Sequence, residues 1–311
     1  MGFGPDDRIA NYRVERELGT TATGELYQAV HLVLPRRAVL KIMHPGRSQT
    51  FAVQLLREAC VLEALQHPGV PQVFESGLLE DKRPWFACEM IEGMTLSERM
   101  VNGPLLAIET AMITRDLAGI LEHAHKRGIV HRALRPDHVV IATRRRGYSA
   151  IAIPDWSEAR AHDATGPEHL ALIPPKARPY IAPELVRGEP ADDRADVFSL
   201  GVLAYQALTG ALPRGDKTLE RSPDAPKELA TLIDQMLSFD RFDRPTAAEI
   251  RADLEWLADA LELEGGDDHE VSPSSSSTLR IRRPRWTPPI PNSPNATLAP
   301  VSGEIIVKKR D

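Results

Sequence analysis

The spacing of apolar side chains along this chain changes its period near residue 93. Before that point, segments rich in β-branched and aromatic residues are separated by turn signals, which predicts strands, and one segment has helical spacing. The predicted strands are 12–19, 25–33, 36–43, 71–79 and 83–91, and the predicted helix is 49–66. Beyond residue 93, helical spacing dominates, in 96–100, 109–128, 195–210, 227–237 and 247–261. A small sheet-rich lobe followed by a larger, mainly helical lobe is an α+β arrangement.

The composition argues against several classes of protein. Of the 311 residues, 42% are hydrophobic and 26% are charged, and the net charge of −6 arises from both signs interspersed along the first 260 residues. That balance gives no basis for nucleic-acid binding by the folded part. The two cysteines, Cys60 and Cys88, lie among apolar residues, so we expect neither a disulfide framework nor a cysteine zinc site. A reducing, cytoplasmic compartment fits this cysteine usage.

No segment predicts a leader or a membrane anchor. Residues 1–10 lack the basic and apolar regions of a secretory signal. The longest uncharged run, 197–213, is shorter than a membrane span and contains glycine and polar residues, so it predicts a buried core helix. We therefore expect a soluble cytoplasmic protein without a transmembrane segment.

The composition shifts again after about residue 265. Residues 266–300 are rich in serine and proline and bury too little apolar surface to offset the entropy of ordering, so 263–311 is expected to be a disordered tail. Arginines and one tryptophan at 280–286 could contact acidic partners or membrane headgroups, although a solvated linker is the simpler interpretation. The apolar stretch within 303–311 could dock on a partner or remain a frayed terminus.

Several short motifs follow one another in an informative order. A turn with glycines at both ends spans 19–24, and the sequence AVLK ends at Lys41. Residues 131–142 read HRALRPDHVVIA, Asp155 lies in the sequence IPDWS, and residues 182–184 read APE. None of these motifs alone is specific for one protein family, but their order and spacing taken together are.

This order of motifs resembles that of the bacterial serine/threonine protein kinase family, over roughly residues 8–262. The resemblance implies the two-lobed protein kinase fold, an α+β fold with a small antiparallel-sheet N-lobe that holds one helix and a larger helical C-lobe. On this alignment the N-lobe and hinge span 8–92 and the C-lobe spans 93–262. The resemblance also implies ATP and Mg²⁺ as cofactors and other proteins as partners.

A nucleotide site follows from the same resemblance. Lys41 takes the position of the lysine that holds the α- and β-phosphates, Glu58 takes that of its ion-pair partner, and Asp155 takes that of a Mg²⁺ ligand. For Glu58, a solvated position on the helix is the alternative. The implied nucleotide-binding residues are Gly19, Gly24, Leu26, Val39, Lys41, Glu58, Glu89, Ile91, Val140 and Asp155.

The residues that transfer the phosphoryl group in this family are replaced here. Ala133 stands at the position of the general-base aspartate and His138 at that of the Mg²⁺-binding asparagine, so no intact catalytic residue is predicted. Imidazole suits zinc better than Mg²⁺, and a packed or solvated His138 is the simpler interpretation. Asp137 could act as a substitute base. Arg135 replaces the loop lysine, and Ala177 replaces a threonine that bonds both catalytic residues.

Other replacements surround the implied nucleotide. Thr21 replaces the middle glycine of the phosphate loop, which should stiffen the loop and crowd the phosphates. Val39 replaces an alanine above the adenine and should narrow that pocket. Trp156 and Ser157 replace the phenylalanine and glycine that follow the metal-binding aspartate. The retained Lys41, Glu58 and Asp155 leave binding of ATP and Mg²⁺ open, but these replacements predict that it is weakened or absent.

Scaffold residues of the family are retained. Glu184 and Arg244 stand where a buried ion pair is formed, and Asp196 stands where an aspartate bonds the backbone of the catalytic loop. A retained scaffold with replaced catalytic residues predicts a pseudokinase, a regulatory or scaffolding module in signalling that acts on an active kinase or its substrates. The alternative is an active serine/threonine protein kinase with degenerate motifs.

Overall fold

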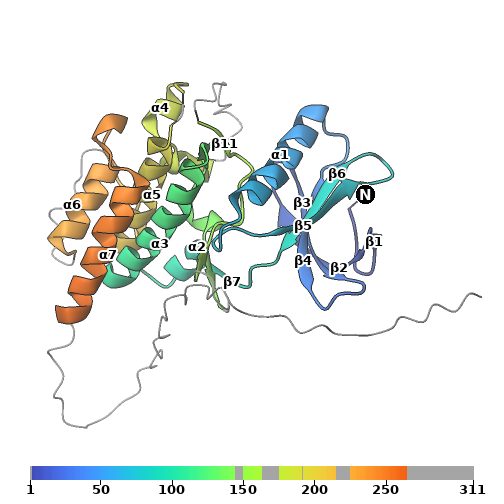
Figure 1. Ribbon diagram of the computed structural model, residues 1–311, viewed down its shortest axis with the longest axis horizontal. Coiled ribbons are helices and arrows are strands. Elements are labelled where there is room, and N and C mark those ends of the chain that lie inside the picture. Colours follow the sequence, from blue (N-terminus) through green and yellow to red (C-terminus); the bar gives the residue numbers. More distant parts are fainter. Residues whose placement is uncertain (1, 144–149, 163–174, 191, 215–224, 265–311) are drawn as a thin grey trace, which may run out of the picture. The chain divides into compact units, whose positions relative to one another are not determined.

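The computed structural model describes residues 2–143, 150–162, 175–190, 192–214 and 225–264. These residues form a sheet-rich N-terminal lobe and a helical C-terminal lobe, which confirms the predicted α+β arrangement (Figure 1). The predicted disordered tail lies outside the described residues from position 265 onward.

One antiparallel sheet forms most of the N-terminal lobe. Its strand order is β1-β2-β3-β4-β6-β5, and every neighbouring pair is antiparallel. The strands are β1 (Arg8–Ile9), β2 (Tyr12–Thr20), β3 (Gly24–His31), β4 (Arg37–Met43), β5 (Val73–Leu78) and β6 (Pro84–Glu89).

The two faces of β4 have different roles because successive side chains of a strand point to opposite sides. Leu40 and Ile42 belong to a core formed by the sheet itself, together with buried aromatic residues such as Tyr12 and Trp85. The alternate positions turn toward the single helix of this lobe, which brings Lys41 into a buried position with only 3% of its surface exposed.

The helix α1 (Gln49–Leu65) packs on the sheet through a face of apolar side chains. Leu55, Leu62 and Leu65 are buried on this face, and Glu58 is the one buried acidic residue among them. The helix ends at Leu65, and the residue that follows, Gln66, has a φ of 42°, in the left-handed region. The spacing of these residues explains why Glu58 faces the sheet rather than solvent.

Helices form most of the C-terminal lobe, with α3 packed against both α5 and α7 (Figure 1). The predicted core helix in 197–213 corresponds to α5, which ends at Thr209, and most of its apolar residues are buried. Gly201 allows α5 to approach α6, because a Cβ at this position would lie 2.9 Å from that of Met236. The helices are α2 (Leu96–Met100), α3 (Ala107–His125), α4 (Pro183–Val186), α5 (Arg194–Thr209), α6 (Lys227–Met236) and α7 (Ala247–Glu264), with 3₁₀ turns at Pro136–His138, Pro175–Tyr180 and Arg241–Asp243.

Two short sheets hold residues 131–139 in place, the segment that carries the predicted catalytic positions and is called the catalytic segment below. β7 (Gly93–Thr95), β9 (Val140–Ala142) and β10 (Ile151–Ala152) form one, and β8 (Ile129–Val130) pairs with β11 (Arg160–Ala161) in the other. Residues 131–139 connect β8 to β9, and Asp155 follows β10 by three residues. The strands therefore fix both ends of the segment that carries the predicted catalytic positions.

Two predictions about composition can be compared with the described residues. None of the helices described is both long and apolar enough to cross a membrane. Cys60 and Cys88 are both free thiols, as expected. Cys88 is buried, but Cys60 is exposed, so the prediction of apolar surroundings was wrong for Cys60. The apolar neighbours of Cys60 in the sequence face the core from the other side of α1.

Candidate nucleotide and catalytic site

A buried ion pair joins the sheet to α1. Lys41 Nζ lies 2.8 Å from Glu58 Oε1 and 2.6 Å from Oε2, so the ammonium group donates to both carboxylate oxygens. The same nitrogen lies 3.9 Å from Asp155 Oδ1. Lys41 is thus placed between two carboxylates, one from the N-terminal lobe and one from the segment after β10.

Burial and neighbouring charges together set the ionisation of Lys41 and Asp155, while burial raises the pKa of Glu58 to about 7. Burial disfavours the charged form of Lys41, but Glu58 and Asp155 outweigh that cost, so the pKa of Lys41 is raised. Burial likewise opposes ionisation of Asp155, but Lys41 and the backbone N–H of Ser157 outweigh it and lower the pKa of Asp155. The site therefore holds an ammonium group and an ionised carboxylate, which suit phosphate and a cation respectively.

The predicted phosphate loop is a tight turn between β2 and β3. The backbone N–H and hydroxyl of Thr21 both donate to the carbonyl of Gly24, at 2.8 and 3.0 Å, and the N–H of Gly24 donates back to the hydroxyl at 3.2 Å. A Cβ on Gly24 would lie 2.3 Å from the carbonyl oxygen of Ile42, so β4 itself requires glycine here. Gly19, with φ of 144°, adopts a conformation that favours glycine.

The other predicted nucleotide-binding residues are spread over four segments. Val39 is half-buried on β4 and is the cross-strand partner of Cys88 on β6. Burial raises the pKa of the Cys88 thiol to about 12, so it is an inert packing group. The remaining residues are Leu26, paired with Lys41 across β3 and β4; Glu89, the last residue of β6; Ile91, after β6; and Val140, buried at the start of β9.

His138 is the most unusual group in the catalytic segment. Its Nε2 lies 3.4 Å from Asp155 Oδ2, and only 8% of its side chain is exposed. Within the described residues neither ring nitrogen has a hydrogen-bond partner. Burial lowers the pKa of His138 to about 4, so the ring is neutral near neutral pH. A buried imidazole without hydrogen bonds is costly, which requires an explanation.

No base stands at the position predicted for the general-base aspartate. Ala133 has a methyl side chain there, and its backbone N–H donates to His131 Nδ1. Asp137, the proposed substitute, has its Oδ2 3.3 Å from Lys176 Nζ and 3.8 Å from Arg135 Nε. Burial alone would raise the pKa of Asp137, but the hydrogen bond from Lys176 and the other contacts of the carboxylate together outweigh burial, so the pKa is lowered. A carboxylate with a lower pKa is a weaker base.

Trp156 and Ser157 occupy the positions after Asp155. The Trp156 ring is fully buried and packs edge-on against His131, with centroids 4.7 Å apart, as expected from its size. Its indole N–H donates to the carbonyl of Ile153 at 2.8 Å. The larger ring therefore anchors this segment to the core.

Asp196 supports the backbone of the catalytic segment. Its carboxylate accepts hydrogen bonds from the backbone N–H groups of His131 and Arg132, at 2.8 and 2.7 Å. Arg132 has φ of 69°, a conformation that costs about 1–3 kcal/mol in a residue other than glycine, so these bonds hold a strained backbone. His125 was not predicted to take part in this arrangement, but its Nε2 donates to Asp196 Oδ2 at 2.8 Å.

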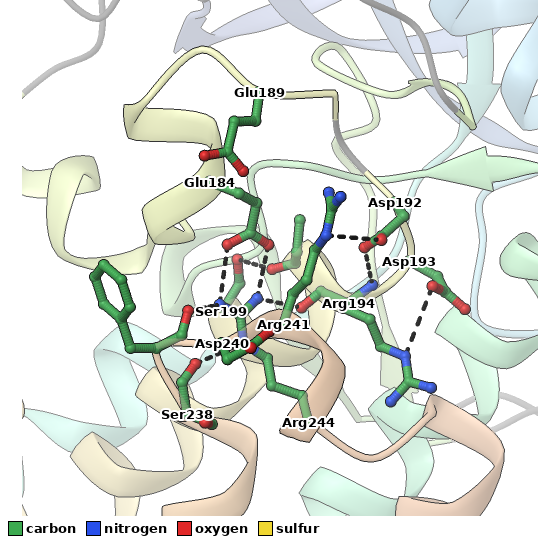
Figure 2. A network of polar contacts seen from close by, with 12 residues as sticks. Glu184, Glu189, Asp192, Asp193, Arg194, Ser199, Ser238, Asp240, Arg241 and Arg244 are labelled. Carbon is green, nitrogen blue, oxygen red and sulfur yellow. Dashed lines mark hydrogen bonds and ion pairs between the residues drawn. The ribbon is translucent and has the colours of Figure 1, made fainter.

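Glu184 and Arg244 form a second buried ion pair, between α4 and the segment before α7 (Figure 2). Two guanidinium nitrogens of Arg244 donate to the two carboxylate oxygens of Glu184, at 2.7 and 2.9 Å. The same guanidinium group also donates to the carbonyls of Ser238 and Arg194, at 2.8 and 3.0 Å. The carboxylate and the guanidinium are each 1% exposed or less, and each is paired.

The residues present fit the family's metal only in part. The ionised carboxylate of Asp155 is an oxygen ligand of the kind that Mg²⁺ prefers. At the second position, an imidazole nitrogen replaces an amide oxygen, and imidazole is a poor ligand for Mg²⁺. The residues present thus offer an oxygen ligand for a cation at Asp155, whereas His138 does not suit Mg²⁺.

The sequence between residues 12 and 256 matches the family model described as the protein kinase domain. The chain belongs to the protein kinase family. Its relatives include the serine/threonine-protein kinase Pkn1 of Myxococcus xanthus, 32% identical over 218 residues, and PknB of Mycolicibacterium smegmatis, 30% identical over 275 residues. These alignments cover 68% and 80% of this chain but only 31% and 43% of the relatives, so the chain spans less than half of their length.

A solved structure of this kinase family supports the same conclusion. The kinase domain of PknI from Mycobacterium tuberculosis superposes with a TM-score of 0.64 at 26% sequence identity. The match covers 82% of this chain and 99% of the PknI domain. The predicted protein kinase fold, with an antiparallel-sheet N-lobe and a helical C-lobe, is therefore confirmed.

Proposed function

We infer that this chain is a protein kinase-like module that binds a nucleotide but does not transfer its phosphoryl group at a useful rate. The observation that carries this proposal is the contrast within one site. Lys41, Glu58 and Asp155 form a buried charged cluster, whereas Ala133 supplies no base and His138 supplies no amide oxygen.

The size of the expected loss follows from the chemistry. A positioned general base contributes typically about 10²–10⁴-fold to a rate. Electrostatic stabilisation of the transferring phosphoryl group by the second metal contributes further. Asp137 does not replace the base, because Lys176 and Arg135 already engage its carboxylate. The module would then act on other proteins as a regulator or scaffold, for example on an active kinase or its substrates.

Nucleotide binding has its own support. Lys41 would hold the α- and β-phosphates, and Asp155 would hold a metal ion that neutralises the charge of the phosphates. A ligand that binds only the folded state raises the melting temperature. We expect ATP with a divalent metal to raise the melting temperature of the full chain, and expect Lys41→Ala to remove the shift. No shift at millimolar ATP would remove nucleotide binding from the proposal.

The second function is that of an active serine/threonine protein kinase. The names of the curated relatives favour it, since they are serine/threonine-protein kinases, and so does the retained Lys41–Glu58 pair. Phosphate transfer from γ-labelled ATP discriminates the two functions. Transfer by the purified chain that disappears in Lys41→Ala would establish the kinase, and transfer equal to that of Lys41→Ala supports the proposal.

A further inference from the structure

The separation of His138 and Asp155 does not suit a hydrogen bond. The two atoms, Nε2 and Oδ2, are 3.4 Å apart, whereas N–H···O hydrogen bonds in proteins have distances of about 2.7–3.2 Å. Both ring nitrogens of His138 lack a hydrogen-bond partner among the described residues, although the side chain is 92% buried. An unpartnered buried ring beside an ionised carboxylate indicates that a group is held between them when the site is filled.

The same separation suits a shared tetrahedral metal ion. A nitrogen and an oxygen ligand, each about 2.0–2.1 Å from Zn²⁺ at a tetrahedral angle, lie about 3.4 Å from each other. Octahedral Mg²⁺ would bring adjacent ligands at about 2.0–2.1 Å to roughly 2.9 Å from each other. Ligand type agrees with the distance, because imidazole suits zinc and carboxylate oxygen accepts either metal.

The two oxygens of Asp155 are already divided between different partners. Oδ1 accepts from the backbone N–H of Ser157 at 3.0 Å and faces Lys41 at 3.9 Å. Oδ2 is the oxygen that faces His138. The ammonium group and the backbone therefore fix the carboxylate from one side, and its other side is presented to the ring.

The remaining metal ligands have to come from outside the protein. In the part of the chain that the structure describes, no group of three or more His, Cys, Asp or Glu side chains could hold a metal ion. Two protein ligands bind Zn²⁺ incompletely, so two coordination positions are left for other ligands. Phosphate oxygens of a nucleotide held by Lys41 are suitable ligands for these positions.

We propose that His138 Nε2 and Asp155 Oδ2 bind one tetrahedral Zn²⁺ ion together with nucleotide phosphate oxygens, so that nucleotide binding by this chain requires Zn²⁺ rather than Mg²⁺. This inference rests on the nucleotide binding proposed above. His138 thus sets the metal specificity of the site instead of only removing a Mg²⁺ ligand.

The test measures binding of a fluorescent, non-hydrolysable ATP analogue to the chelator-treated full chain with Zn²⁺, with Mg²⁺ and with chelator. The wild type is expected to bind at least about tenfold more tightly with Zn²⁺ than with Mg²⁺. His138→Asn, which restores the family's amide, should lose at least the 10–100-fold in metal affinity that disturbing the surroundings of a metal typically costs. His162→Asn, a change of a surface histidine, is the matched control and should behave as the wild type.

A spectroscopic arm tests the geometry without relying on affinity alone. Co²⁺ in place of Zn²⁺, with the ATP analogue, should give the intense visible absorption of four-coordinate cobalt in the wild type and not in His138→Asn. Asp155→Asn should also lose the band, which provides a second variant. Thermal melting followed by circular dichroism confirms that each variant is folded before its spectrum is compared.

The binding results distinguish failure of the zinc site from failure of nucleotide binding. Equal affinities with Zn²⁺, Mg²⁺ and chelator would overturn the zinc site and leave the proposed nucleotide-binding function in place. Zinc-dependent binding that survives His138→Asn would overturn it as well. No binding of the analogue under any condition would overturn both this inference and the nucleotide-binding part of the proposed function.

Discussion

The Glu184–Arg244 pair and the His138–Asp155 pair are both buried, but they differ in how their polar atoms are satisfied. Arg244 donates to both oxygens of Glu184 and to neighbouring carbonyls (Figure 2). His138 has no hydrogen bond from either ring nitrogen among the described residues, and it faces Asp155 at 3.4 Å. The first pair is complete within the protein, and the second is not.

This difference indicates that Glu184 and Arg244 stabilise the fold, whereas His138 and Asp155 are placed to bind a ligand. A buried ion pair with one partner removed is strongly destabilised, so every atom of such a pair has to be matched inside the protein. Buried polar atoms without partners are uncommon in folded proteins, and His138 differs from the other buried side chains of this kind in that both of its polar atoms lack a partner among the described residues. In this chain the Glu184–Arg244 pair is satisfied within the protein, whereas the ring of His138 is not satisfied within the described residues.

Restoring the catalytic segment gives the largest expected effect. The double variant Ala133→Asp with His138→Asn places a base and an amide where the kinase family has them. We expect its phosphate transfer to a generic protein substrate to exceed that of the wild type by about 10²–10⁴-fold, the usual contribution of a general base. The measurement is initial-rate transfer from γ-labelled ATP with Mg²⁺. A double variant as inactive as the wild type would show that the loss of chemistry lies elsewhere in the site.

Breaking the complete pair should have the next largest effect. Glu184→Gln removes the charge that matches the buried guanidinium of Arg244, and breaking a buried pair from one side costs about 3–5 kcal/mol. Urea unfolding measures this change in the free energy of unfolding. Glu189→Gln is the matched control, because Glu189 pairs with Arg187 at the surface, and its unfolding curve should overlay that of the wild type. Equal effects of the two substitutions would contradict the distinction drawn here.

Asp196 tests whether the catalytic segment is still held in a kinase-like conformation. Asp196→Asn weakens the acceptor for the backbone N–H groups of His131 and Arg132. Each hydrogen bond to a charged group contributes about 1.5–3 kcal/mol, so urea unfolding should show a loss of that order.

The pH dependence of stability gives a second test of Asp196. Burial opposes its ionisation, but the hydrogen bond from His125 outweighs it, so the pKa of Asp196 is lower in the folded state than the unfolded value of about 3.9. The stabilisation is therefore present above that value and is lost as the pH falls below it. Below about pH 4 the wild type should lose stability more steeply than Asp196→Asn. Parallel slopes would contradict this assignment.

Thr21 should give the smallest effect. Its hydroxyl closes the turn at Gly24, and a neutral hydrogen bond contributes about 0.5–1.5 kcal/mol, so Thr21→Val should lower stability by that order. Thr21→Gly removes the same bond and also frees the loop, so it should in addition bind the ATP analogue more tightly than Thr21→Val. Equal affinities of the two variants would show that the side chain at this position does not crowd the phosphates.

The fold could be predicted from the sequence because local patterns specify it. The apolar run with β-branched residues at 36–43 and the helical spacing along 49–66 predict the strand and helix that bring Lys41 and Glu58 together. The long uncharged run at 197–213 predicts the buried helix α5. These patterns depend on which side of each element is apolar, and that information is present in the order of residues.

The arrangement of the site could be predicted only in part. The motifs indicated that Ala133 and His138 occupy catalytic positions, but not that the ring of His138 is buried 3.4 Å from Asp155. The role of His125 was also missed, because its partner Asp196 lies 71 positions away in the sequence. Distances between segments of this kind are set by packing of the whole lobe, which single-sequence patterns do not contain.

We propose that this protein keeps the kinase scaffold but has lost phosphoryl transfer. Transfer of phosphate from γ-labelled ATP by the purified chain tests this proposal, measured beside Lys41→Ala and the Ala133→Asp, His138→Asn double variant with Mg²⁺ and, separately, with Zn²⁺. The wild type should incorporate no more phosphate than Lys41→Ala with either metal. Incorporation by the wild type that Lys41→Ala abolishes would contradict it and establish an active kinase.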